Sequence, residues 1–179
     1  MKKERNIALA VCAVLAALIL LLTSQSSPLY PINLWGDANC LFTVGRVMKD
    51  GGVLYRDIYE QKGPLLYLIH ALAACLSDTS FGGVYIMEAL AMTVALYAAY
   101  RLMRLRAGMG FSLGAAAFFG AAFASCTAFI RGDSAEEFCL PLLMAALAIA
   151  YAEYGRRAKP MRMKRLFVCG VLAGCIATI

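Results

Sequence analysis

The feature that most constrains this chain is a series of long apolar runs separated by short charged segments. A helix rises about 1.5 Å per residue, so roughly 20 apolar residues cross the ~30 Å hydrocarbon layer of a membrane. With 62% hydrophobic and only 16% charged residues, the chain lies outside the usual range of soluble domains. The sequence predicts an all-α fold, a polytopic transmembrane helix bundle with an outer loop carrying interfacial helices. The predicted spans are Ile7 to Leu22, Gly83 to Tyr100, Met109 to Ile130, Phe138 to Tyr154, and a last one that starts at Leu166.

The distribution of charge predicts how the spans are oriented. Twelve of the seventeen basic residues fall before residue 7, at 101–106 or at 156–165, and the positive-inside rule assigns these segments to the cytoplasm. The other five basic residues, with eight of the eleven acidic ones, then lie outside, in a large loop at 24–82 and a second loop at 131–137. We therefore expect a multi-pass protein of the cell membrane with a cytoplasmic amino terminus. The basic residues form short clusters rather than a stripe along one face, so no nucleic-acid partner is expected.

Two short segments of the large loop are predicted to lie at the membrane surface. Asp37 to Asp50 has apolar residues at helical spacing and is followed by two glycines, which predicts an interfacial helix. Pro64 to Leu76 is apolar but has only thirteen residues, too few to cross comfortably, and is expected to be interfacial or re-entrant. Its His70 is expected to have a hydrogen-bonding partner rather than to bind a metal. Glu88 lies inside a predicted span and should face the bundle with a partner, in a structural or a functional role.

Chemistry is expected in the polar stretch from Trp35 to Pro64 and in the acidic cluster that follows Arg131. The first contains Asp37 and Lys62, and the second contains Asp133 and Glu136. A carboxylate can act as a general base or bind a metal, and a lysine or arginine can hold a phosphate. These groups are the parts needed to transfer a group from a phosphate ester in the membrane. The alternative, that they are solvated loop charges, stays open at this point.

The motifs WGDAN, VGRVMKDGGVLYRDIYEQKGPLLYLIHAL and FIRGDSAEEFCLP resemble the amino-terminal half of GT-C membrane glycosyltransferases. The resemblance covers nearly all 179 residues and is strongest to the bacterial protein mannosyltransferase-like and aminoarabinose transferase-like group. It implies an enzyme that uses a polyprenyl-phosphate-linked sugar at the outer leaflet. The implied acceptor is a lipid, a cell-wall polymer or a protein.

The resemblance also implies roles for individual residues. Asp37 corresponds to the general base, and Lys62, with Tyr59 beside it, to the contact with the donor phosphate. Apart from the resemblance, Arg131 is a second cation that can stabilise the charge of the leaving phosphate. Asp133 and Glu136 correspond to acids that bind a divalent metal or the substrate. Ala38 follows Asp37 where many relatives have a second acid, so metal binding is not expected there. A further residue, Asp57, is expected to shape the loop.

A rival hypothesis is a non-enzymatic membrane protein, either a transporter half or a lipid-binding assembly subunit. Transporters place polar groups near the bilayer midplane. In this sequence the charged residues within predicted spans are Glu88 and, next to the end of its span, Glu153; the others concentrate at the span ends and loops, and that favours chemistry at the membrane surface. The last apolar run ends after fourteen residues at Ile179, so we expect the chain to be the amino-terminal part of a longer protein and to be inactive alone.

Overall fold

The computed structural model describes residues 2–129, 131–154 and 161–179, and within them the fold is entirely helical. The described residues form no β-strand, only an isolated bridge between Leu54 and Ile58. The all-α prediction is therefore confirmed. The helices are α1 (Lys2–Thr23), α2 (Gly36–Lys49), α3 (Pro64–Leu76), α4 (Gly82–Met103), α5 (Met109–Ala124), α6 (Ala135–Tyr154) and α7 (Met163–Ile176).

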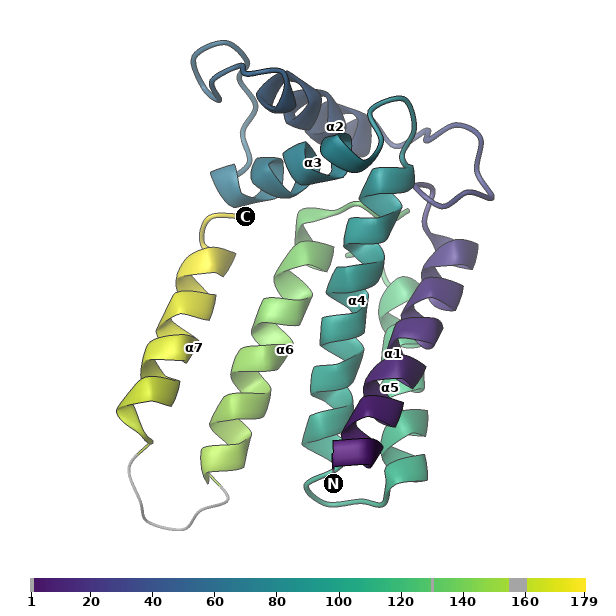
Figure 1. Ribbon diagram of the computed structural model, residues 1–179, viewed down its shortest axis with the longest axis vertical. Coiled ribbons are helices and arrows are strands. Elements are labelled where there is room, and N and C mark those ends of the chain that lie inside the picture. The colour runs from purple at the N-terminus through teal and green to yellow at the C-terminus, as the bar shows by residue number, and fades with distance from the viewer. Residues whose placement is uncertain (1, 130, 155–160) are drawn as a thin grey trace.

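Figure 1 shows α1, α4, α5, α6 and α7 side by side, with α2 and α3 across one end of them. In the upright set, α4 contacts α1, α5 and α6, while α7 packs on α6. The pair α2 and α3 pack on each other, and α3 also contacts α4. We call the end that carries α2 and α3 the capped end. The opposite end holds the first turn of α1 and the turn between α4 and α5, and we call it the basic end.

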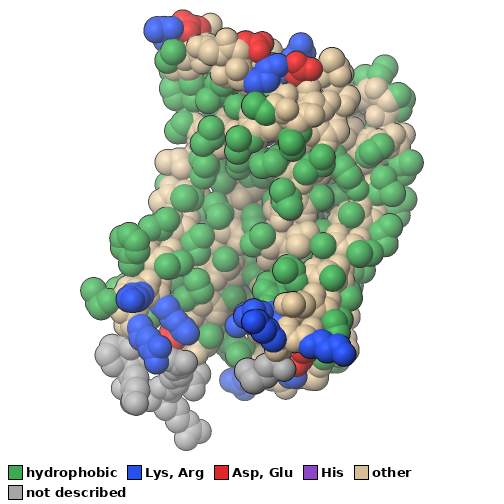
Figure 2. Space-filling view, viewed as in Figure 1, with side chains coloured by type: hydrophobic (Ala, Val, Ile, Leu, Met, Phe, Trp, Pro, Cys, Tyr) green, Lys and Arg blue, Asp and Glu red, His purple; other side chains and the backbone are tan. Residues whose placement is uncertain are grey.

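Among the described residues, three helices are long and apolar enough to cross a membrane by length and composition: α1, α4 and residues 135–153 of α6. Figure 2 shows hydrophobic side chains covering the middle of this face, whereas charged side chains gather at its two ends. Between α1 and α4 the core is built on small residues: Ala8, Cys12 and Ala16 recur every four residues and are fully buried. Small side chains at this spacing let two helix backbones approach closely.

The structure corrects two predicted boundaries. The span predicted to reach Ile130 ends at Ala124, because Ser125 leaves the helix and its hydroxyl donates to the carbonyl of Ala121. Ile130 lies outside the described residues, and so do the predicted cytoplasmic residues Arg156, Arg157 and Lys159. The second predicted outer loop is also shorter than 131–137, since α6 begins at Ala135. Acidic side chains in a first helical turn are stabilised by the helix dipole, and this turn contains Glu136 and Glu137.

The two short helices of the large loop have nearly the residue bounds predicted for them. The chain leaves α2 through Gly51, whose φ of +92° favours glycine, and α3 has Pro64 in its first turn. The two helices approach closely at Gly45, where an added Cβ would lie 2.5 Å from the carbonyl carbon of His70. The outward face of α3 carries leucines at fourfold spacing that are about half exposed: Leu68, Leu72 and Leu76.

Candidate functional site at the capped end

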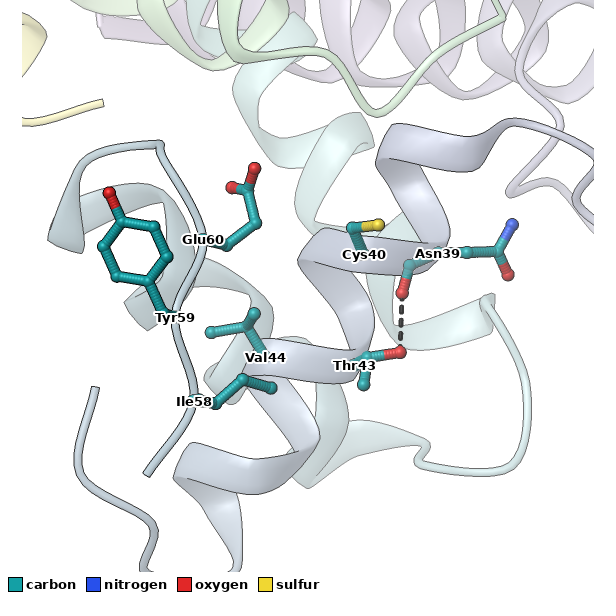
Figure 3. Close-up of a pocket in the computed structure, with 7 residues that line it drawn as sticks. All are labelled: Asn39, Cys40, Thr43, Val44, Ile58, Tyr59 and Glu60. Carbon is teal, nitrogen blue, oxygen red and sulfur yellow. Dashed lines mark hydrogen bonds between the residues drawn. The ribbon is translucent and has the colours of Figure 1, made fainter. Parts of the chain in front are cut away.

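A pocket of about 270 Å³ lies between α2 and the loop that leads into α3. On the helix side its lining includes Asn39 and Thr43, and on the loop side it includes Tyr59 and Glu60 (Figure 3). The Tyr59 ring is 78% exposed, so one face of an aromatic ring is open to a ligand. The Thr43 hydroxyl donates to the carbonyl of Asn39, 2.7 Å away, which leaves its lone pairs as acceptors. The pocket thus offers an aromatic surface with hydrogen-bonding groups around it.

Glu60 is the ionised group of this pocket. Burial alone would raise its pKa, but hydrogen bonds from the Tyr67 hydroxyl and from the backbone of Gln61 and Lys62, with the nearby Lys62 charge, hold the pKa below its usual value. The Lys62 backbone N–H donates to the Glu60 carboxylate at 3.2 Å. The same N–H donates to the Tyr67 hydroxyl at 2.8 Å. Glu60 is therefore a fixed carboxylate that can accept hydrogen bonds from a ligand hydroxyl.

Asp37 and Lys62, the expected base and phosphate contact, flank this pocket without lining its described surface. The Asp37 side chain is exposed in the first turn of α2, three residues before Cys40 and seven before Val44, both of which line the pocket. Residues three and seven apart share a helix face, so Asp37 adjoins the pocket along α2. Lys62 immediately precedes α3, and the Tyr55 hydroxyl donates to its carbonyl at 2.7 Å.

A second polar group, fully buried, lies beneath α3 at the same end of the bundle. We call it the acid cluster, and it consists of Ser24, His70, Glu88, Asp133 and Glu137. His70 of α3 contacts Asp133, which lies between α5 and α6, with 2.7 Å from Nε2 to Oδ1. The other ring nitrogen, Nδ1, donates to the Leu66 carbonyl at 2.8 Å, so Nε2 carries a proton toward Asp133 only when the ring is cationic. The cluster ties α3 to the upright helices.

Glu88 is the centre of the acid cluster. It accepts a hydrogen bond from the Ser24 hydroxyl at 2.9 Å and from the Asp133 backbone N–H at 2.7 Å. The Glu137 carboxylate lies beside it, and both carboxylates accept the Asp133 backbone N–H, at 2.7 Å for Glu88 and 3.0 Å for Glu137. The prediction that Glu88 faces the bundle with a partner is confirmed.

The turn that presents Asp133 has an unusual backbone. Gly132 has a φ of +85° and Asp133 a φ of +56°, two successive left-handed residues. An added Cβ at Gly132 would lie 2.4 Å from the Ser24 hydroxyl oxygen and 2.6 Å from Glu88 Oε1. Left-handed geometry at a residue other than glycine persists where its surroundings hold it in place. Here the Asp133 N–H is held between the carboxylates of Glu88 and Glu137, at 2.7 and 3.0 Å.

His70 is the one basic side chain of the acid cluster. Burial would lower its pKa, but the charge and hydrogen bond of Asp133, the bond to Leu66 and the charge of Glu88 outweigh burial, so the His70 pKa is raised above its usual value. The imidazolium is thereby favoured in contact with Asp133. The prediction that His70 has a partner is confirmed.

The remaining predicted site residues are distributed over the surface of the capped end. Arg131 is exposed, and its backbone carbonyl accepts the Gln25 N–H at 2.8 Å. Asp57 accepts the Val53 N–H at 2.8 Å and pairs with Arg56, contacts that hold the turn around Tyr55. Asp133 is buried, whereas the Glu136 side chain is exposed. The side chains of Asp133 and Glu136 therefore do not point into the same space.

The residues do not fit the expected divalent metal well. Asp133 is buried against His70 while Glu136 is exposed, and the described part of the chain holds no group of three or more His, Cys, Asp or Glu side chains placed as metal ligands. No step below is routed through a metal.

Sequence reasoning passed over two residues of this end. The sequence does not distinguish Glu137 from Glu136. The available signal was an acid within the apolar run of α4, Glu88, together with an acid at the start of α6, which can approach each other as a carboxyl pair. Glu60 lies among other charged residues of the large loop, and no local pattern indicates that Tyr67 and the backbone fix it. The structure reveals both because it brings together segments far apart in the chain.

Comparisons of the chain with protein-family models, with curated proteins and with solved structures find no match. The resemblance to GT-C glycosyltransferases therefore rests on the motifs quoted above.

Proposed function

We propose that the chain belongs to a multi-pass membrane glycosyltransferase that moves a sugar from a polyprenyl-phosphate donor to a lipid, cell-wall or protein acceptor at the outer leaflet. The observation that carries the proposal is the pocket between α2 and the loop before α3. An open aromatic ring, Tyr59, suits the apolar face of a sugar, and Glu60, Asn39 and Thr43 supply hydrogen-bond partners for its hydroxyls.

The position of this pocket suits a donor that is anchored in lipid. In the part of the chain that the structure describes, three helices have the length and apolarity of membrane spans, and α2 and α3 lie across one end of the bundle. The exposed leucines of α3 give that helix an apolar face suited to the membrane surface. By the positive-inside preference this end faces out of the cell, where the long polyprenyl chain can stay in the bilayer while the sugar enters the pocket.

The proposed reaction uses Asp37 and Lys62. An acceptor hydroxyl oxygen attacks the anomeric carbon of the sugar, and the bond from that carbon to the phosphate oxygen breaks with its electron pair leaving on the phosphate. Asp37 takes the hydroxyl proton, and the Lys62 ammonium stabilises the charge that grows on the phosphate. Arg131, exposed on the same end, can add a second cation.

The acid cluster has a positioning role in this proposal. Its side chains are fully or almost fully buried, so a donor sugar cannot reach them as the structure stands. Through His70 and Asp133 they hold α3 on the bundle, and Lys62 and Tyr59 lie in the segment that enters α3. Loss of the cluster is expected to shift these residues out of reach of the donor.

The position of Glu88 weighs against the rival hypothesis of a transporter half. Glu88 lies six residues after the start of α4, or about 9 Å along the helix axis, whereas the midpoint of this 22-residue helix lies at about 16 Å. The other four members of the cluster lie at or beyond helix ends or in α3. Transport sites lie closer to the midplane.

The test is sugar transfer from a labelled polyprenyl-phosphate donor in proteoliposomes of the full-length protein. Asp37→Asn keeps the shape of the side chain and loses the proton acceptor, so transfer should fall about 10²- to 10⁴-fold while donor binding stays near the wild-type value. Asp57→Asn is the matched control and should retain more activity, because Asp57 only contacts its own turn. Wild-type transfer by Asp37→Asn would remove the proposed base.

A further inference from the structure

The basic end of the bundle contains a hollow with the charge of an anion-binding site. It has a volume of about 570 Å³ and lies between the first turn of α1 and the last turns of α4. Four cations line it, together with two tyrosines and one acid: Lys2, Arg5, Arg101, Arg104, Tyr97, Tyr100 and Glu4. We call it the basic pocket.

The single acid of the basic pocket is already neutralised. Glu4 pairs with Arg104, 2.8 Å from Nε to Oε1, and accepts a hydrogen bond from the Tyr100 hydroxyl at 3.2 Å. Arg101 lies over the Tyr97 ring, 6.0 Å from its centroid, and the side chains of Lys2 and Arg5 are exposed. One acid against four cations leaves an excess positive charge, and the first turn of α1 adds the positive end of a helix dipole.

An apolar groove continues from the basic pocket along the bundle. Its volume is about 410 Å³, and it shares Tyr97 and Arg101 with the basic pocket. Alanines of α4 and α6 form much of its floor, because their short side chains leave space between the helices: Ala98, Ala145, Ala148 and Ala152. Val94 extends the apolar lining along α4 away from the charged end, and Ile149 adds to the lining from α6. Arg165 of α7 lies in its wall and pairs with Glu153.

We propose that these two hollows together bind one anionic glycerophospholipid of the leaflet at the basic end. The phosphate headgroup lies in the basic pocket against Arg5 and Arg101, and an acyl chain lies in the alanine-lined groove. The apolar groove favours a lipid over a free phosphate, because only a lipid has an acyl chain to fill it. A soluble anion would contact the cations of the basic pocket alone. This inference rests on the proposed membrane insertion but not on the glycosyltransferase activity at the other end.

The test is native mass spectrometry of the full chain released from nanodiscs that hold equal amounts of phosphatidylglycerol and phosphatidylcholine. Wild type should retain phosphatidylglycerol preferentially, and Arg101→Gln should reduce that preference about fivefold, the effect of about 1 kcal/mol per basic residue near a lipid surface. Arg106→Gln is the matched control, because Arg106 lies over the Tyr151 ring and outside the lining of both hollows. Equal retention of both lipids by wild type would overturn the proposal.

The groove is tested separately. Ala148→Leu fills it and should lower phosphatidylglycerol retention, whereas Ala122→Leu, on the exposed face of α5, should not. A thermal melt by circular dichroism checks that both variants fold, and Ala145→Val provides a milder filling if Ala148→Leu unfolds. A competition experiment compares soluble glycerol phosphate with short-chain phosphatidylglycerol as displacers of the bound lipid. If both displace it equally well, the site binds phosphate without using the groove, and the lipid assignment is overturned. If the protein shows no sugar transfer but retains the lipid as expected, the proposed function is contradicted and the lipid site is not.

Discussion

The contact between His70 and Asp133 gives the sharpest prediction about how the capped end is held together. Replacing His70 with leucine keeps an apolar side chain against Phe138, whose ring lies edge-on to the imidazole with centroids 5.8 Å apart. It removes the group that contacts Asp133 Oδ1 at 2.7 Å. Asp133 Oδ2 already has no hydrogen-bond partner among the described residues, so the variant leaves a fully buried carboxylate whose side-chain oxygens lack a donor.

The expected cost follows from this burial. Removing one partner of a buried ion pair costs about 3 to 5 kcal/mol, because the remaining charge is uncompensated. At 1.36 kcal/mol per factor of ten, this corresponds to a change of about 10² to 10⁴ in the equilibrium that frees α3 from the bundle.

Hydrogen exchange of the α3 backbone amides measures this equilibrium directly. Protection of Leu66 to Ala74 should fall by the stated factor in His70→Leu, while the middle of α4 should change little. The control is Leu72→Ala, which trims an exposed side chain of the same helix and should leave protection near the wild-type value. Unchanged α3 protection in His70→Leu would refute the claim that the acid cluster ties α3 to the bundle.

Two other predictions concern pH and orientation. Because folding raises the pKa of His70, the stabilising effect of the His70 imidazolium is fully present below the ordinary pKa of 6.5 and is lost as pH rises through the folded pKa. In wild type, the hydrogen-exchange protection of α3, corrected for intrinsic exchange, should therefore fall as pH rises through the folded pKa. In His70→Leu it should not change with pH. Cys40 and Cys75 are exposed on α2 and α3, so with the other cysteines replaced both should react with an impermeant thiol reagent applied to intact cells. Labelling of Cys75 only after the cytoplasm is opened would reverse the proposed orientation of α3.

Local sequence signals were sufficient for the two short helices α2 and α3. Pro64 begins α3, and the glycines after Asp50 end α2, so their bounds were predicted closely. The same reasoning overestimated the third span, because Ser125, Cys126 and Thr127 interrupt an otherwise apolar run too briefly for hydropathy to register. Apolar composition predicts that a helix exists better than where it ends.

The contacts of the acid cluster lay beyond local reasoning. His70 and Asp133 are 63 residues apart, and their contact depends on α3 lying across the bundle. The choice between Glu136 and Glu137 depends on the rotation of α6 about its axis, which buries Glu137 beside Glu88 and exposes its neighbour. The sequence predicted that Glu88 and His70 need partners, but only the packing of four separate segments identifies those partners.

The central claim, that the capped end binds a lipid-phosphate sugar, is tested most directly by donor affinity. Equilibrium binding of a fluorescent polyprenyl-phosphate sugar to the full-length protein in nanodiscs should be saturable, and Lys62→Ala should weaken it about 10- to 150-fold, as expected for a charge-assisted contact of 1.5 to 3 kcal/mol. Lys3→Ala, an exposed lysine at the opposite end, should bind like wild type. Equal affinities for wild type, Lys62→Ala and Lys3→Ala, or no saturable binding by wild type, would contradict the account.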